Sequence, residues 1–256
     1  MKATDEVRRA MAPQGVLRTT INLGNPILAG RHPEATRPPE ATRPPEATRP
    51  HGISVDLAAL IAERLGVELE MQVFESAGQA VAAVDAGRAD MGFFARDPER
   101  GRGIDFTSPY VLIEGCYLVR EASPIIDMAE VDRSDNRIVV GKGSAYDLFL
   151  SRAIQQAELV RSPTSPAVVA YFLEHELEVA AGVKQQLEAG IEEYGGMRLL
   201  PGRFMTIEQA MGVPKGRDPV AREFLAAFIE EVKAEGIVAE LMSRHGIEGA
   251  TVAPKA

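Results

Sequence analysis

Cysteine and tryptophan are almost absent from this chain of 256 residues, which has one Cys and no Trp. A single cysteine excludes an intramolecular disulfide, although one thiol does not identify the compartment. No apolar run approaches the roughly 20 residues of a membrane-spanning helix, and the start, MKATDEVRRAMAPQG, lacks the apolar segment of a secretory signal. We therefore expect no direct membrane insertion, and either a mature exported chain that begins with a new Met or a protein that stays in the cytoplasm.

The chain also lacks the excess of basic residues that nucleic-acid binding needs. It carries 28 Lys and Arg against 37 Asp and Glu, which gives a formal net charge of −9. This balance argues against nucleic acid and against an anionic membrane as the main partner. What is present is a globular composition, with 45% hydrophobic and 25% charged residues, on a chain long enough for one large domain or two small ones.

Motifs for metal, nucleotide or nucleophilic chemistry are missing as well. The histidines are His32, His51, His175 and His245. None has metal-ligand spacing to another His or Cys. The glycines at 141 and 143 match neither a phosphate-binding loop nor a dinucleotide fingerprint, and no G-x-S-x-G elbow occurs. Cys116 lies in an apolar run, where a core residue is commoner than a nucleophile, so we expect no cofactor, no metal and no catalytic residue.

A tandem repeat interrupts the chain early. The stretch HPEATRPPEATRPPEATRPHG contains PEATRP three times. Its prolines block helix and sheet hydrogen bonds and favour extended chain, and its Glu and Arg residues alternate. We predict a solvated loop insertion over residues 33–50 that arose by tandem duplication, with a docking motif for a partner as the alternative.

Hydrophobic periodicity predicts alternating strands and helices along the rest of the chain. ISVDLAALIAERLG predicts a helix with Ser54 as N-cap and Gly66 as its end. VELEMQVF alternates strictly and predicts a strand that follows this helix. The same order of strand and helix returns about 100 residues later, and the chain finishes in two helices broken at Gly236. The pattern predicts two α/β lobes with a crossover between them, not one continuous sheet.

Three local features are candidates for ligand contact. Arginines gather in FFARDPERGRGIDFTSPY, after a short apolar strand, where a guanidinium can hold a carboxylate; the alternative for each is a solvated surface charge. VVGKGSAYDLF predicts a strand, a glycine turn and a helix that begins near Ser144, whose free N–H groups favour an anion. Glu114 stands alone in the apolar run VLIEGCYLV and needs a salt bridge, water at a lobe boundary, or a ligand.

The order of several motifs matters more than any one of them. GVLRTTINLGNP, GISVDLAALIAERLGVELEM, AGRADMGFFARDPERGRGIDFTSPY, VGKGSAYD and AMGVPKG resemble, over residues 15–246, the family 3 extracellular solute-binding proteins, the polar amino acid receptors of ABC importers. The resemblance implies an α/β, periplasmic-binding-protein-like fold of type II, with two lobes, two crossover strands and a ligand cleft between the lobes. It divides the chain into an N-terminal tail (1–14), lobe 1 (15–112 and 209–246, with the insertion 33–50), lobe 2 (113–208) and a C-terminal tail (247–256).

The resemblance also implies a site for the carboxylate of the ligand. Arg100 matches the family arginine that holds this group, and the start of a lobe 2 helix, at Gly143, Ser144 and Ala145, matches a second contact. Asn22 and Asn25, which border the turn after the first strand, and Phe93 before the arginine complete the lining that we predict. The other candidates are Glu114 and three positions at which the chain departs from the family pattern, Ala95, Asp97 and Val183.

These departures bear on the ligand. Where the family strand offers hydroxyls this chain has Phe93, Ala95 and Asp97, and where an acid normally holds the α-amino group it has Val183 and Lys184. The carboxylate contact is therefore predicted to be kept and the ammonium contact to be lost or moved. Either Glu114 or Asp97 replaces the missing acid, or the ligand is a small carboxylate without an α-amino group.

The sequence thus predicts a monomeric solute-binding protein that captures an amino acid or related organic acid for ABC-type uptake, with a permease as partner. The family implies the periplasm, whereas a native start at Met1 implies the cytoplasm. One alternative is an enzyme of the same fold, such as a dehydratase of the cyclohexadienyl type, with Glu114 as a general acid whose pKa is raised by apolar neighbours. The other is a cytoplasmic small-molecule sensor.

Overall fold

The structure is a computed structural model that describes residues 3–31 and 50–256. The predicted insertion 33–50 lies outside these residues except for its last one. The helices are α1 (Asp5–Met11), α2 (Ile53–Leu65), α3 (Ala77–Asp85), α4 (Ala145–Ala153), α5 (Val168–Glu174), α6 (Lys184–Tyr194), α7 (Pro219–Ala234) and α8 (Ile237–Arg244), with 3-10 turns η2 (Arg100–Arg102) and η3 (Met128–Glu130). The strands are β1 (Val16–Asn22), β2 (Gly30–Arg31), β3 (Pro50–His51), β4 (Glu68–Phe74), β5 (Met91–Ala95), β6 (Ile104–Arg120), β7 (Arg137–Gly141), β8 (Glu158–Ser162), β9 (Val179–Val183), β10 (Met197–Leu199), β11 (Met205–Pro214) and β12 (Thr251–Val252).

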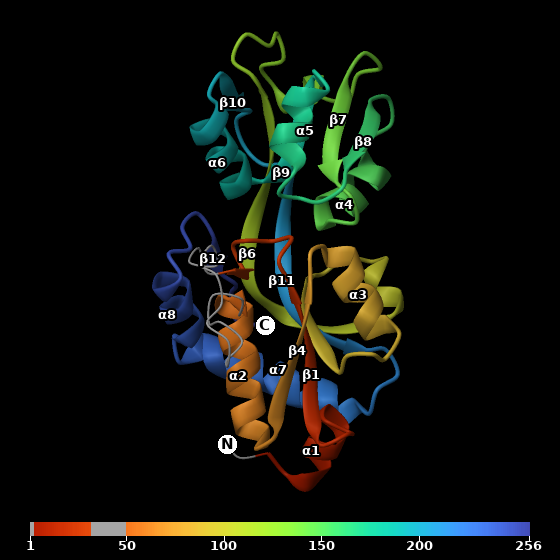
Figure 1. Ribbon diagram of the computed structural model, residues 1–256, viewed down its shortest axis with the longest axis vertical. Coiled ribbons are helices and arrows are strands. Elements are labelled where there is room, and N and C mark those ends of the chain that lie inside the picture. Colours follow the sequence, from red (N-terminus) through yellow and green to blue (C-terminus); the bar gives the residue numbers. More distant parts are fainter. Residues whose placement is uncertain (1–2, 32–49) are drawn as a thin grey trace, which may run out of the picture.

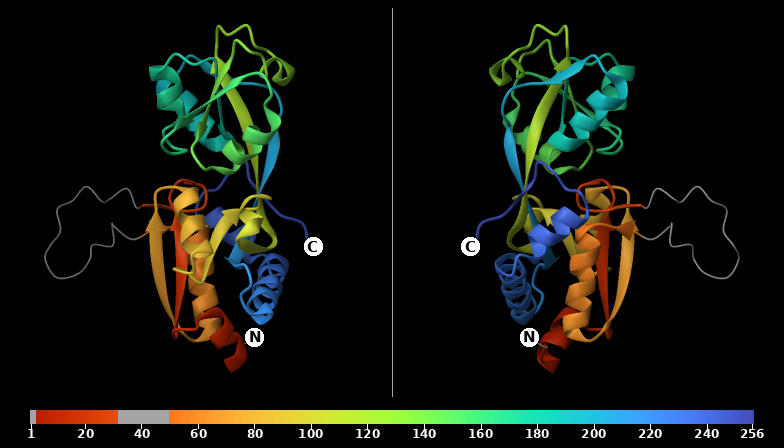
Figure 2. Two further views of the ribbon diagram at one scale, coloured as in Figure 1. Left: turned by 90° about the vertical axis from the view of Figure 1, so that its right-hand side faces the viewer. Right: turned by 90° about the vertical axis from the view of Figure 1, so that its left-hand side faces the viewer.

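Two lobes are stacked along the long axis of the molecule, and β6 and β11 run through the waist between them (Figures 1 and 2). Lobe 1, the lower one in Figure 1, holds β1, β4 and β5 with α1, α2, α3, α7 and α8. Lobe 2 holds β7, β8, β9 and β10 with α4, α5 and α6. The predicted lobe boundaries, after residues 112 and 208, fall inside the two crossover strands and stay predictions.

The strands of both lobes belong to one hydrogen-bonded sheet. Its order is β4-β1-β5-β11-β6-β9-β7-β8, with β10 and β12 also paired to β6, which makes 10 strands. The neighbours of β1 and of β7 are parallel to them, whereas β11 is antiparallel to β5 and β6. Because β6 and β11 pair with each other, they join the strands of lobe 1 and of lobe 2 in one sheet. The expectation that the two lobes do not share one continuous sheet is therefore wrong.

The apolar face of α2 forms part of the lobe 1 core. Leu57, Ile61 and Leu65 are fully buried, and Gly66 ends the helix with φ 67. The N-cap is Gly52 and not Ser54, whose backbone N–H donates to the carbonyl of Leu28. Gly52 has φ 123, and a Cβ there would lie 2.5 Å from that carbonyl oxygen. The chain therefore needs glycine where the helix begins, because both the backbone angle and the close approach exclude a side chain.

Both predicted tails contain ordered structure. Met11 at the end of α1 is fully buried, and α1 packs against α7. At the other end β12 pairs with β6, where Thr251 lies opposite Leu112. The sequence did not predict these elements because α1 is only two turns long and β12 has only two residues, so neither shows a period.

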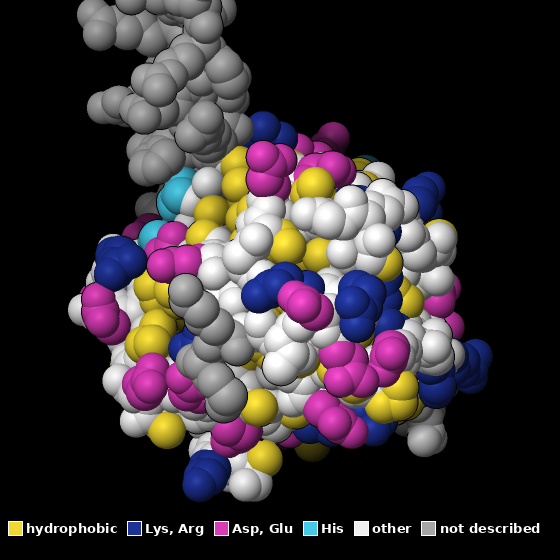
Figure 3. All heavy atoms as spheres, turned by 90° about the horizontal axis from the view of Figure 1, so that it is seen from below, with side chains coloured by type: hydrophobic (Ala, Val, Ile, Leu, Met, Phe, Trp, Pro, Cys, Tyr) yellow, Lys and Arg dark blue, Asp and Glu magenta, His cyan; other side chains and the backbone are white. Residues whose placement is uncertain are grey.

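Seen from below, the face of lobe 1 carries Lys and Arg side chains interspersed with Asp and Glu, and its hydrophobic side chains are scattered (Figure 3). No large patch of one charge sign is visible on that view of the described residues. Charges of opposite sign are therefore mixed on this face.

Candidate functional site

A cavity of about 40 Å³ lies between the lobes, beside the carboxyl ends of β1 and β5 and the start of α4. Lobe 1 contributes five of the predicted residues to its lining: Asn22, Asn25, Phe93, Ala95 and Arg100. Lobe 2 contributes three more: Ser144, Ala145 and Val183. The structure thus brings eight predicted site residues to one place, and ligand contact by each of them stays a prediction.

Arg100 crosses the boundary between the lobes. It begins η2, just after β5, and only 6% of it is exposed. Its Nη1 donates to the carbonyl of Ala95 at 3.0 Å, and its Nη2 donates to the carbonyl of Gly143 in lobe 2 at 2.9 Å. Burial lowers the pKa of Arg100 to about 10, so the guanidinium is charged at neutral pH. A guanidinium has five N–H donors, so donors remain for a ligand.

The start of α4 is held by its own side chains. Ser144 is the N-cap, and its hydroxyl accepts from the N–H of Asp147 at 3.0 Å. The N–H of Gly143 donates to the carboxylate of Asp147 at 2.8 Å. Gly143 therefore offers its carbonyl to Arg100, and its N–H is already bonded. A ligand anion would therefore have to contact those N–H groups in the first turn of α4 that remain free.

Polar side chains that the sequence did not single out also line the cavity. Gln209 on β11 is 4% exposed, and Tyr146 and Ser165 line the lobe 2 side of the cavity. Burial raises the pKa of Tyr146, and the neighbouring Ser165 hydroxyl opposes that shift. The Oδ1 atom of Asn25 is buried and has no hydrogen-bond partner among the described residues. A buried acceptor without a partner is costly unless a ligand or water satisfies it.

Asp97 does not line the cavity. Its carboxylate accepts from Arg152 on α4 at 2.6 Å and from the backbone N–H of Glu99 at 2.8 Å. The first contact joins lobe 1 to lobe 2, as does the bond from Gln185 on α6 to the carbonyl of Glu248 at 2.8 Å. Asp97 is thus an interlobe contact, and its charge is already paired.

Glu114 is not placed to contact a ligand in the cavity either. Its carboxylate pairs with Arg203 at 2.9 Å and with Lys184 at 3.3 Å. The hydrogen bond from Arg203 and the contact with Lys184 hold the pKa of Glu114 below its ordinary value, against the effect of burial. The general acid of the enzyme alternative would need the opposite shift, so this paired carboxylate gives that alternative no support. The prediction overlooked that Arg203, 89 residues away in the chain, folds back onto β6.

Loss of the Asp97–Arg152 contact is expected to open the lobes without removing ligand binding. Arg152 is 44% exposed at its side chain, so Arg152→Ala should weaken affinity by less than about tenfold. Small-angle X-ray scattering on the ligand-free protein should show a larger radius of gyration than for the parent. Arg133→Ala is the matched control, because Arg133 pairs with Glu130 inside lobe 2. An unchanged radius of gyration in Arg152→Ala would contradict the role of this contact.

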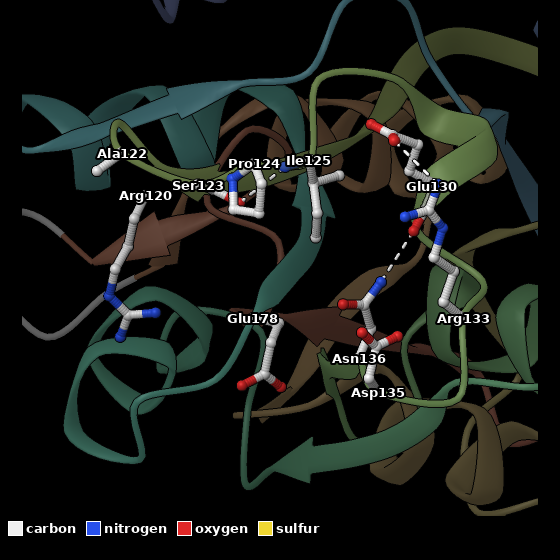
Figure 4. A pocket seen from close by; sticks show the side chains of 10 residues that line it. All are labelled: Arg120, Ala122, Ser123, Pro124, Ile125, Glu130, Arg133, Asp135, Asn136 and Glu178. Carbon is white, nitrogen blue, oxygen red and sulfur yellow. Dashed lines mark hydrogen bonds and ion pairs between the residues drawn. The ribbon is translucent and has the colours of Figure 1, made fainter.

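A larger hollow, of about 430 Å³, lies at the outer end of lobe 2 (Figure 4). Most of its charged side chains already have partners within lobe 2: Arg133 pairs with Glu130, Glu178 pairs with Arg137, and Arg120 donates to the carbonyl of Leu177. A third hollow, of about 300 Å³, lies between α6 and the end of α8 and reaches His51, beside the residues outside the structure. Neither gathers the predicted site residues, so the cavity around Arg100 is the candidate site.

Residues 3–31 and 50–256 contain neither a membrane-spanning helix nor a cluster of metal ligands. No helix there is long and apolar enough to cross a membrane. The same residues contain no cluster of three or more His, Cys, Asp or Glu side chains that would hold a metal ion.

Comparison with known proteins gives both a family and a fold. A family model described as bacterial extracellular solute-binding proteins, family 3, matches residues 33–248. A solute receptor for L-cysteine of Neisseria gonorrhoeae is 19% identical with a TM-score of 0.78, and the match covers 96% of this chain and 99% of that one. An amino acid ABC transporter substrate-binding protein of Streptococcus pneumoniae, bound to L-arginine, is 18% identical with a TM-score of 0.74, covering 93% and 97%.

A third similar structure is a histidine kinase sensor domain described as similar to periplasmic binding proteins. It is 16% identical with a TM-score of 0.75, and the match covers 93% of this chain and 98% of that one. At such identities these structures show the shared fold alone, which is that of type II periplasmic binding proteins. No curated protein matches the chain by sequence.

Proposed function

The chain belongs to the bacterial extracellular solute-binding proteins of family 3, and from this premise we propose that it captures a small carboxylate-bearing metabolite for uptake by an ABC permease. The ligand is an amino acid or a related organic acid, and it occupies the cavity between the lobes. The observation that carries the proposal is Arg100, a charged guanidinium that is only 6% exposed and lines this cavity. A buried cation of this kind favours an anion as partner.

Ligand binding and lobe closure are coupled in this proposal. The ligand carboxylate contacts Arg100 of lobe 1, and the first turn of α4 at Ser144 and Ala145 contacts the same ligand from lobe 2. A ligand that touches both lobes stabilises the closed arrangement by its extra affinity for that arrangement. The bond from Arg100 to the carbonyl of Gly143, at 2.9 Å, joins the same two elements. The closed lobes then form the surface that a permease recognises.

A sensor is the second candidate function, and the likeness to a histidine kinase sensor domain favours it. Both functions need the same cavity and the same closure, and they differ in the partner that reads the closed state. The description of the family as extracellular supports a location outside the cytoplasm, and we propose the periplasm. An enzyme of the same fold is less well supported, since the expected acid Glu114 is held by Arg203 and Lys184.

Thermal unfolding across a panel of amino acids and small organic acids tests the proposal. A ligand present at 100 times its Kd stabilises the folded state by about 2.7 kcal/mol, which is expected to raise the Tm by several degrees. The corresponding amides, which have nearly the same size, are the control, because they lack the carboxylate that Arg100 recognises. A panel in which no carboxylate raises the Tm more than its amide would contradict the proposed function.

A further inference from the structure

We propose that the cavity selects a small monocarboxylate that carries a neutral hydrogen-bond donor, such as a 2-hydroxy acid, over the α-amino acid of the same carbon skeleton. This proposal rests on the proposed function, because it names the ligand class of the same site. It is carried by the charges and the unsatisfied polar atoms around the cavity.

The charge of the cavity lining favours a ligand with a net negative charge. Among the described residues that line the cavity, Arg100 alone carries a formal charge at neutral pH. A ligand with one carboxylate and no cation neutralises it. A zwitterionic amino acid brings a carboxylate and an ammonium, so that one positive charge stays without a partner in a buried site. Such an unpaired buried charge strongly disfavours binding.

The nearby acids are not available to pair with an ammonium. Asp97 is bonded to Arg152 at 2.6 Å across the lobe boundary. Asp147, in the first turn of α4, accepts from the N–H of Gly143 and pairs with Arg161 at 3.0 Å. Each would have to give up its present partner to face the ligand, and in lobe 2 that would also disrupt the start of α4.

Glu114 completes the set of nearby acids. It pairs with both Arg203 and Lys184, and Lys184 directly follows Val183, the lobe 2 residue that lines the cavity. The position next to the cavity is therefore occupied by a cation, and the single carboxylate of Glu114 is shared between this cation and Arg203. This arrangement disfavours an ammonium nearby and leaves the carboxylate of Glu114 satisfied.

Neutral acceptors are what the cavity does offer. The Oδ1 atom of Asn25 has no partner among the described residues, and this side chain is nine-tenths buried in the lining. A ligand hydroxyl has one hydrogen to donate and would satisfy this oxygen, whereas an ammonium has three donors to satisfy. Gln209, 4% exposed in the same lining, is a further neutral polar group. A carboxylate with an adjacent hydroxyl thus matches Arg100 and Asn25 together.

The rest of the lining sets the size of the ligand. Phe93, Val183 and Ile207 are apolar, and the cavity measures about 40 Å³. A short apolar side chain on the ligand fits these surroundings better than a long or charged one, because an extra charge would be buried without a partner. Lactate and 2-hydroxyisovalerate are therefore suitable probes.

Matched pairs test the selection directly. Isothermal titration calorimetry compares L-lactate with L-alanine and L-2-hydroxyisovalerate with L-valine, and the D-enantiomers are measured alongside. In each pair of which a member binds, the hydroxy acid is expected to bind about tenfold tighter or more, because its complex leaves no unpaired buried charge. An amino acid that binds as tightly as its hydroxy acid, or more tightly, overturns the inference while leaving the proposed function intact. If no carboxylate of a wider panel binds, both fail.

A variant that adds a negative charge gives a second readout that does not depend on the absolute affinity. Asn25→Asp places a carboxylate beside the ligand with almost no change of shape, so it is expected to shift the preference of each pair toward the amino acid by about tenfold or more. Asn25→Ala is its matched control, since it removes the acceptor without adding charge and should weaken the hydroxy acid without favouring the amino acid. The Tm of both variants verifies folding. A preference that Asn25→Asp leaves unchanged overturns the role assigned to this position.

Discussion

Arg100→Ala is expected to lower ligand affinity by roughly 30- to 5,000-fold, the range found when one partner of a buried, hydrogen-bonded charge pair is removed. Arg100 alone supplies a charge to the described cavity lining, so no neighbour can replace it. The variant also loses the bond to the carbonyl of Gly143, which joins the lobes. Affinity therefore falls both because the carboxylate loses its counter-charge and because the closed arrangement loses a contact.

Arg102→Ala is the matched control for this experiment. Arg102 belongs to the same turn, η2, and has the same charge, but its side chain is exposed and does not line the cavity. Titration calorimetry with a ligand found in the panel should show near-parental affinity for Arg102→Ala, and the Tm of both variants should verify folding. If Arg100→Ala binds as well as the parent, Arg100 does not hold the ligand, and the assignment of the site is wrong.

Much of the fold and of the cavity could be predicted because local patterns determine them. Apolar residues recur in α2 with the helical period of 3.6 residues, so they lie on one face of the helix. In β4 they recur every second residue, so they lie on one face of the strand. Arg100 follows a short apolar strand, and Ser144 follows a glycine turn, so both were expected at strand ends that border a ligand cleft in α/β folds. The structure places both in the lining of one cavity.

What the sequence could not predict depends on contacts between distant residues. The partner of Asp97 is 55 positions away, and Glu114 is neutralised by Arg203, 89 positions away. No periodicity reveals such pairs, so both acids remained candidates for ligand contact until the fold was known. Gln209 was missed for a related reason, because a polar residue in a strand normally faces water, and only the register of β11 shows that it is buried.

Ion pairs around Asp90, at the far end of lobe 1 from the cavity, are expected to have a large effect on stability. Asp90, just before β5, is fully buried, and its carboxylate accepts from both Nε and Nη2 of Arg18 at 3.0 and 2.8 Å. It also accepts from Arg217 at 2.8 Å and from the backbone N–H of Arg18 at 3.0 Å. One carboxylate thereby joins β1, β5 and the segment that leads into α7, and the hydrogen bond that Arg18 donates to Asp90 raises the pKa of Arg18.

Asp90→Asn is expected to lower the free energy of unfolding by about 3–5 kcal/mol, because it leaves two guanidinium groups without their buried counter-charge. The amide keeps the shape of the carboxylate, so the loss reports charge and hydrogen bonding and not a cavity. Urea denaturation measures it, with an unchanged m value required for the comparison. Glu208→Gln is the matched control, since the Arg96–Glu208 pair is 46% and 45% exposed and such pairs contribute about 0–1 kcal/mol. A loss in Asp90→Asn no larger than in Glu208→Gln would mean that packing alone holds β1, β5 and α7 together. The expected difference would instead mean that the ion pairs of Asp90 with Arg18 and Arg217 hold β1 and β5 in place. The carboxyl ends of these strands then present Asn22 and Ala95 to the cavity.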